Sequence, residues 1–275
     1  MDELKLDKSL VENPQDWRLS MTISEKKLEM VAYSLKEQNT LMHHLLPLAD
    51  TSTSPIAALG DVVYDNTLLL SDFSVTDVLI DTSRFIIVPT EMATEAEESL
   101  ILSTLWPGEK LTAISHPIVS TTDTLLAGVD SKVVSFVRRT FPTATVRHRL
   151  TPLLSYLITN DHEVGVTTMY VNVRDQRMDV IYFSERGLQA VNTYQTPTLD
   201  DMLYYIMTVA KGCDMNISKD EIVICGDASE ADHLQSLVKK YVRTVLTMDP
   251  PYEVASLGTT ALTAPLELTL LPLCV

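Results

Sequence analysis

The order of β-strands in the second half of the chain constrains the fold more than any other feature of the sequence. Residues 167–194 contain three segments in which apolar and polar side chains alternate, with short polar turns between them and an amphipathic helical segment directly after them. Such alternation is typical of strands that bury one face. The same order occurs near the N-terminus, in segments 18–23, 27–35 and 40–46, and a helical segment follows from Pro55. The chain is therefore predicted to be a duplication of one architecture.

Strand and helix candidates alternate through the rest of each half. In the first half the pattern predicts strands at 85–88, 111–115, 124–127 and 144–147, and helices at 91–105, 130–139 and 153–158. The continuous apolar run at 85–88 is expected to be buried on both faces. In the second half, helix 198–210 precedes strand 221–225, and a turn leads from that strand into another helix, which is typical of an α/β sheet. We therefore predict an α/β fold with a boundary between domains 1–160 and 161–275.

The charge balance excludes several classes of partner. The chain of 275 residues has 21 Lys and Arg against 37 Asp and Glu, a net charge of −16. Such an excess repels phosphate backbones, and no locally basic face is evident, so no nucleic-acid partner is expected. No stretch approaches the ~18 consecutive apolar residues of a membrane span, and MDELKLDKSL is too charged for a signal-peptide core. A cytoplasmic protein without a membrane partner is expected.

Cysteine and histidine positions predict no metal site and no covalent catalysis. Cys213, Cys225 and Cys274 are odd in number and far apart, which argues against a disulfide framework and against a metal clamp. We expect all three to be reduced thiols. His43 and His44 are adjacent on a predicted strand, where they would point to opposite faces and could not readily share one metal ion. No catalytic residue is assigned.

Each half of the chain is predicted to contain three hairpin strands followed by a helix, a strand and a helix. This order resembles the ribonuclease-H-like half that is duplicated in actin-like ATPases, sugar kinases and heat-shock chaperones. Residues 221–242, EIVICGDASEADHLQSLVKKYV, look like the segment that follows the adenine in those proteins, and residues 255–262 resemble their closing small-residue turn. The chain is also similar to a bacterial family of unknown function assigned to this fold. The resemblance implies an actin-like ATPase fold made of two ribonuclease-H-like halves.

The departures from that fold's pattern concern its phosphate-binding turns. In active members, the first hairpin turn of each half carries an aspartate and glycines, because glycine lets backbone N–H groups approach the phosphates while the carboxylate organises Mg²⁺. The corresponding turns here, residues 23–27 and 173–177, contain no glycine. Asp227 stands where a second glycine is expected after Gly226, and it adds negative charge beside an anionic ligand. The nucleotide motifs are degenerate, and ATP hydrolysis by the family mechanism is not expected.

Some residues remain candidates for binding a nucleotide through altered loops. If the chain does so, the resemblance implies that Gly226, Ser229 and Gly258 lie near the adenosine and that Lys26 or Arg174 lies near phosphate. Together with Lys27 and Arg177, the last two could form a phosphate clamp that reaches from both hairpins into the interdomain cleft. The alternative is that these charged side chains occupy solvated turns.

Two other segments are candidates for interfaces. The C-terminal LTAPLELTLLPLCV contains leucines that either pack on their own domain or pair with a partner or a second copy by strand addition, and its two prolines predict an edge strand or an extended tail. Tyr204, Tyr205 and Met207 add bulk to the helix at 198–210, as core residues or as a partner surface.

The function is not determined by the sequence, and whether the chain is an enzyme stays open. The leading hypothesis is a non-catalytic interaction or scaffold protein that binds a protein or peptide and needs no cofactor, with actin-like adaptors of bacterial pilus and secretion assemblies as the family precedent. The alternative is a nucleotide-binding protein or weak ATPase. A third hypothesis, a hydrolase of the ribonuclease-H kind, requires clustered carboxylates at strand ends that the sequence does not assign.

Overall fold

The computed structural model describes residues 5–49, 54–161 and 165–274, so the start of the charged N-terminal stretch and the last C-terminal residue lie outside it. The chain forms two compact units, Met1–Ile158 together with Tyr252–Val275, and Thr159–Pro251. The domains predicted from the sequence were 1–160 and 161–275. The predicted and observed divisions differ mainly in the last segment, Tyr252–Val275, which belongs to the first unit.

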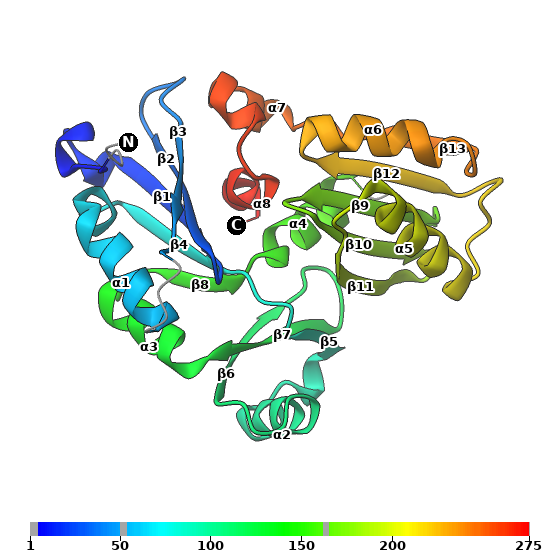
Figure 1. The fold of residues 1–275 in the computed structure, drawn as a ribbon, viewed down its shortest axis with the longest axis horizontal. Helices are drawn as coiled ribbons and strands as arrows, with labels where there is room; N and C mark the ends of the chain where they lie inside the picture. Colours follow the sequence, from blue (N-terminus) through cyan, green and yellow to red (C-terminus); the bar gives the residue numbers. More distant parts are fainter. Residues whose placement is uncertain (1–4, 50–53, 162–164, 275) are drawn as a thin grey trace. The chain divides into compact units, whose positions relative to one another are not determined.

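The first unit is built on a five-stranded sheet in the order β3-β2-β1-β4-β8. Three antiparallel strands come first in the chain, and two parallel strands extend the sheet beyond β1. The bounds are β1 Trp17–Ile23, β2 Lys27–Ser34, β3 Met42–Pro47, β4 Val75–Ile80 and β8 Thr145–His148. Helices α1 (Pro55–Asp65) and α3 (Ser131–Thr140) lie on one side of this sheet and share its apolar core (Figure 1).

A second, three-stranded antiparallel sheet lies between β4 and β8 in the chain, in the order β5-β7-β6. It comprises β5 Phe85–Pro89, β6 Leu111–Pro117, β7 Asp123–Asp130 and the helix α2 Glu95–Leu105, with a small core of its own. The prediction that 85–88 is buried on both faces is wrong. Phe85, Ile86 and Ile87 are only partly buried, because β5 is an edge strand that pairs with β7 alone.

The second unit repeats the first sheet. Its strand order is β11-β10-β9-β12-β13, which matches β3-β2-β1-β4-β8 position by position and in strand direction. The bounds are β9 Thr168–Arg174, β10 Arg177–Ser184, β11 Gly187–Gln195, β12 Glu221–Gly226 and β13 Thr244–Thr247. Helices α5 (Leu199–Gly212) and α6 (Ala228–Val238) cover one face and form its core (Figure 1). The predicted duplication is confirmed.

The C-terminal segment folds back on the first unit. After α7 (Tyr252–Ala255), the short helix α8 (Leu266–Thr269) contacts β1, β2 and α4 (Leu150–Tyr156). Leu268 and Leu270 are fully buried. An edge strand or extended tail was expected, but Pro265 instead stands at the N-cap of α8, a position at which its missing N–H leaves no helical bond unmade. Packing on its own domain, 161–275, was one of the two alternatives, but the segment packs on the strands of the first unit instead.

A buried ion network joins three neighbouring strands of the first sheet, from β1 to the edge strand β8. Asp77 on β4 is 2 % exposed. Its Oδ2 accepts hydrogen bonds from Nε and Nη2 of Arg18 on β1, at 3.1 and 2.7 Å, and its Oδ1 accepts one from Nη1 of Arg147 on β8, at 2.7 Å. A buried carboxylate is tolerated when its lone pairs are satisfied by opposite charge. Asp77 therefore holds three neighbouring strands together, although the sequence analysis did not predict β4.

Asp77→Ala is expected to destabilise the first unit by about 3–5 kcal/mol, because it leaves two guanidinium groups without their buried counter-ion. Asp65→Ala is the matched control, because Asp65 pairs with Lys5 while its side chain is 60% exposed, and its loss should cost less than about 1 kcal/mol. Urea unfolding followed by tryptophan fluorescence measures this unit alone, since Trp17 and Trp106 both lie in it. Equal losses in the two variants would contradict the assigned role of Asp77.

Candidate functional site

The turn between β1 and β2 is closed by hydrogen bonds within itself. The Ser24 hydroxyl donates to the Lys27 carbonyl at 2.9 Å, and the Lys27 N–H donates to the Ser24 Oγ at 3.1 Å. The Ser24 N–H also donates to the Lys27 carbonyl, at 3.0 Å. Glu25 and Lys26 are exposed at the tip. The amides of Ser24 and Lys27 are thus engaged inside the turn and do not point to a ligand.

The Lys27 side chain is also committed within the first unit. Its Nζ lies 2.9 Å from Oε2 of Glu29, a residue that is only 4 % exposed. The other carboxylate oxygen of Glu29 lies 2.8 Å from Nε2 of His43. The predicted phosphate clamp included Lys27, but the structure pairs this lysine with a buried carboxylate instead.

The turn between β9 and β10 has an unusual backbone. Arg174 and Arg177 are paired across a two-residue loop, whose residues Asp175 and Gln176 have φ values of 49° and 57°. A two-residue hairpin favours positive φ at both positions, which glycine, asparagine and aspartate adopt most readily. The loop thus keeps its tight geometry without glycine, and it presents two exposed side chains. The guanidinium Nε of Arg174 lies 3.3 Å from Oδ2 of Asp175.

The turn between β12 and α6 packs directly on the end of β9. Gly226 has φ +103°, and a Cβ at this position would lie 2.1 Å from the carbonyl oxygen of Val173. The N–H of Asp227 donates to that same carbonyl at 2.9 Å. Glycine is required here because two backbones approach closely, a role that needs no ligand.

The N-terminus of α6 is capped by the chain's own carboxylate. Oδ1 of Asp227 accepts hydrogen bonds from the N–H groups of Ser229 and Glu230, at 3.0 and 3.2 Å. The free N–H groups and the dipole make a helix N-terminus a natural anion site. In this chain an aspartate oxygen already occupies that site, so the first amides of α6 are satisfied.

Negative charge accumulates around this cap. Burial raises the pKa of Glu230, and the nearby carboxylates of Asp227 and Asp175 raise it further. Among the described residues, Oε2 of Glu230 is buried without a hydrogen-bond partner. Three acidic side chains therefore act on one another at the two adjacent turns, which disfavours the approach of a phosphate.

The nucleotide-binding candidates are distributed over both units. Gly226, Ser229 and Arg174 lie at the adjacent turns of the second unit, while Lys26 and Gly258 lie in the first. Gly258 has φ +121°, and a Cβ there would meet Asn39 in the loop after β2 at 3.4 Å. Gly258 thus packs against its own unit, and the joint role of the five residues stays a prediction.

Each of the two five-stranded sheets also holds a buried carboxylate, Glu29 or Asp179, that the sequence analysis missed. Asp179 is the third residue of β10, as Glu29 is of β2. Its oxygens accept hydrogen bonds from Asn172 Nδ2 at 3.0 Å and Thr193 Oγ1 at 2.7 Å. The available signal was one acidic residue within an otherwise apolar strand, in KLEMVAYS and RMDVIYFS. Both carboxylates are held by local partners, which suits structural roles.

The thiols and the possible metal ligands give no support to a catalytic centre. All three cysteines are free. Burial raises the pKa of Cys274 to about 11 and also raises that of Cys213, so both are protonated near neutral pH and are poor nucleophiles. In the parts of the chain that the structure describes, no three His, Cys, Asp or Glu side chains are grouped so that they could hold a metal ion.

Residues 7–245 match the family model described as protein of unknown function (DUF3822). The chain belongs to the DUF3822 family. No curated protein matches this DUF3822 member.

Solved structures place the DUF3822 chain in the actin-like ATPase fold. A Bacteroides thetaiotaomicron protein with an actin-like ATPase fold and unknown function has a TM-score of 0.73 at 22% identity, over 86% of this chain and 91% of that one. A PilM-PilN type IV pilus biogenesis complex gives 0.62 at 14% identity, over 94% and 98%. At these identities the likeness shows the fold, and it confirms the predicted fold class. No helix within the described ranges is long and apolar enough to cross a membrane.

Gly226→Ala is expected to destabilise the second unit more than Gly187→Ala does. Both residues have positive φ, which costs alanine about 1–2 kcal/mol, but a Cβ at Gly187 meets nothing within 4 Å. The clash of the Gly226 Cβ with β9 should add at least ~1 kcal/mol. Hydrogen exchange of the β9 and β12 amides measures the difference. Equal protection in both variants would show that β9 and β12 do not need the close approach.

Glu230→Gln is expected to stabilise the second unit at neutral pH. A carboxyl whose folded pKa is raised disfavours the folded state when charged, and this penalty disappears as the pH falls through the raised pKa towards the unfolded value. The gain in melting temperature should therefore be present at pH 7 and absent near pH ~3, below the unfolded pKa, where the carboxyl is protonated in both states. Circular dichroism melts across this range test it. Asp232→Asn, an exposed change on the same helix, is the control.

Proposed function

We propose that this DUF3822 chain is a non-catalytic interaction protein on an actin-like fold whose turns no longer accept a triphosphate. The observation that carries the proposal is the carboxylate of Asp227 on the first amides of α6. A phosphate in the same place would have to displace this side chain and then lie beside it. The cost of bringing like charges together opposes both steps.

The hairpin turns support the same conclusion in each unit by itself. In the first unit, Ser24 occupies the amide of Lys27, and Glu29 occupies the Lys27 ammonium group. In the second unit, Asp175 stands at the hairpin tip and lies beside Arg174. Donors that are already paired contribute little to a new ligand, because each new hydrogen bond replaces an existing one.

The precedent for an interaction role is a similar structure of the same fold. The PilM-PilN complex is named as an assembly of two proteins in type IV pilus biogenesis. It supports the class of function, protein binding, and not a particular partner for this chain. We place the protein in the cytoplasm, without a nucleic-acid or membrane partner and without a cofactor. The proposal does not use strand addition by the C-terminal leucines, because Leu268, Leu270 and Leu271 are buried and the segment forms short helices.

Calorimetric titration and thermal melts with Mg²⁺-ATP and Mg²⁺-ADP test the loss of nucleotide binding. No saturable heat and no rise in melting temperature are expected, whereas a site at 100 times its Kd would add about 2.7 kcal/mol. Asp227→Ser keeps a capping oxygen and removes the charge, so it is the variant that could restore binding, with Asp232→Ser as control. Saturable binding to the unmodified chain would overturn the proposal and establish the nucleotide-binding alternative.

Capture of partners by the tagged chain tests the other half of the proposal. A protein that co-purifies with the chain should bind it again when both are purified, with the same affinity in the presence and absence of nucleotide. Failure to reconstitute any complex from purified components would contradict an interaction role.

A further inference from the structure

An open groove runs between α5 and α6 in the second unit. One hollow of about 750 Å³ lies along α5 toward Tyr241, and a second of about 490 Å³ lies between the start of α5 and the end of α6. Asp200 lines both hollows, so the two adjoin at the start of α5. From Asp200 to Lys211 the groove follows α5 for ~16 Å, about three helical turns.

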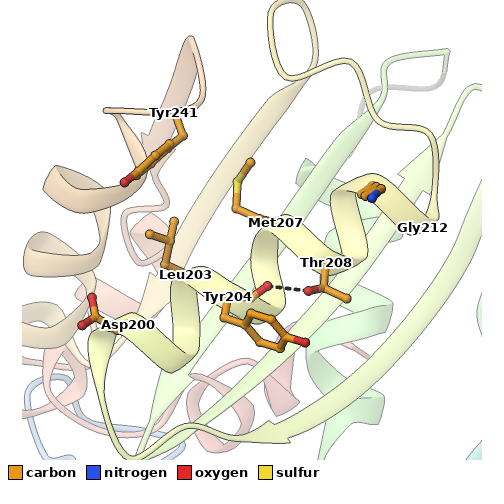
Figure 2. A pocket seen from close by; sticks show the side chains of 8 residues that line it. Asp200, Leu203, Tyr204, Met207, Thr208, Gly212 and Tyr241 are labelled. Carbon is orange, nitrogen blue, oxygen red and sulfur yellow. Dashed lines mark hydrogen bonds between the residues drawn. The ribbon is translucent and has the colours of Figure 1, made fainter.

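Helix α5 has one broad apolar face. Met202, Ile206 and Ala210 form its buried part, which packs on the sheet. Leu203 and Met207 form its edge: they pack against the same core but are only partly buried, and they lie on the side of α5 that faces Tyr241 (Figure 2). The apolar face of α5 thus extends past the buried core to the surface. This partly exposed edge leaves apolar surface for another molecule to cover.

Two tyrosines stand at this groove in exposed positions. The side chains of Tyr204 and Tyr241 are 64% and 55% exposed. The Tyr204 ring contacts Tyr205 edge to face at 5.3 Å, and Tyr205 stacks on Tyr194 of β11 at 4.3 Å. Tyr204 is thus held in place by rings packed beneath it. Exposed aromatic residues with a fixed position are the usual anchors of protein interfaces.

The charge at the groove is opposite in sign to that of the chain. Lys211 lines the first hollow and Lys240 the second, against the single acidic side chain of Asp200, whereas the whole chain carries −16. Lys239 and Arg243 are exposed close by in sequence. Within the described residues, none of these four cations makes an ion pair.

We infer that this groove binds an acidic amphipathic helix of a partner protein. Apolar side chains spaced at i, i+3, i+4 and i+7 would fill the space beside Leu203, Met207 and Tyr241, and flanking carboxylates would meet Lys211 and Lys240. A second copy of the chain is disfavoured by its charge of −16, and a nucleic acid by the apolar floor. The inference rests on the proposed function and names the surface and the partner's chemistry.

A binding assay with designed peptides tests the chemistry. The probe is a fluorescein-labelled helical peptide with leucines at i, i+3, i+4 and i+7 and glutamates elsewhere. The comparison peptide has lysines in place of the glutamates. Anisotropy should show at least ten-fold tighter binding of the acidic peptide. The double variant Lys211→Glu/Lys240→Glu and the single variant Tyr204→Ala should each weaken binding of the acidic peptide at least ten-fold.

The matched control for the charge reversal is Lys219→Glu/Lys132→Glu, which changes two exposed lysines outside the groove and should leave binding unchanged. Circular dichroism melts confirm that each variant folds. Equal binding of the two peptides, no binding of either, or equal effects of the groove and control variants would each overturn the inference.

Photo-crosslinking locates the natural occupant. A benzoylphenylalanine at position 204, compared with one at 219, should crosslink in cells to an acidic amphipathic segment of another protein. A crosslink to a second copy of this chain would overturn the inference. The proposed function fails separately, by saturable nucleotide binding or by the absence of any reconstituted complex. A reconstituted partner that binds outside the groove would retain the proposed function and refute only the groove.

Discussion

The first sheet depends on the burial of Asp77 between two arginines. This carboxylate lies on the strand that joins the hairpin strands to the outer parallel strand, and Arg18 and Arg147 reach it from both sides. A buried charge without such partners would cost several kcal/mol, so β4 can occupy its place only when β1 and β8 are both present. The second unit has the same strand order. There, β9 and β12 join through apolar side chains and through the close backbone approach that Gly226 permits.

Local pattern was sufficient to predict the hairpin strands, because apolar and polar residues alternate along them. The expectation that such strands bury one face is wrong for β1, β2, β9 and β10, which are buried along nearly their whole length. Local pattern did not predict β4, because Asp77 interrupts the apolar pattern and is neutralised by residues 59 and 70 positions away. The run at 85–88 is the opposite case. Its apolar residues predicted a strand buried on both faces, but they form an edge strand in a small sheet. Long-range pairing decides both cases, and a single sequence does not display it.

The positions of the turns at the candidate site could be predicted from local pattern, whereas the contacts made there could not. The two turns without glycine were located correctly, since hairpin positions follow from strand alternation. Gly226 was predicted to bind a nucleotide only if the chain does so through altered loops, and that prediction stays open; the sequence did not reveal the packing role that its φ and its contact with Val173 show. The sequence also placed Asp227 near a helix start, yet only the geometry shows that its carboxylate accepts hydrogen bonds from the N–H groups of Ser229 and Glu230.

Helix α6 connects the two surfaces of the second unit on which the proposals rest. Its N-terminal amides are satisfied within the chain, so a ligand at that end would gain only by exchanging one anion for another. Its C-terminal end borders the groove, where Tyr241 is largely exposed and Lys240 has no counter-ion among the described residues. Covering apolar surface there yields roughly 25 cal/mol per Å², and no existing contact has to be broken first. Under the proposed function, the free energy for binding in this unit would come from the surface along α5 and α6 and not from the turns that the resemblance assigns to a nucleotide.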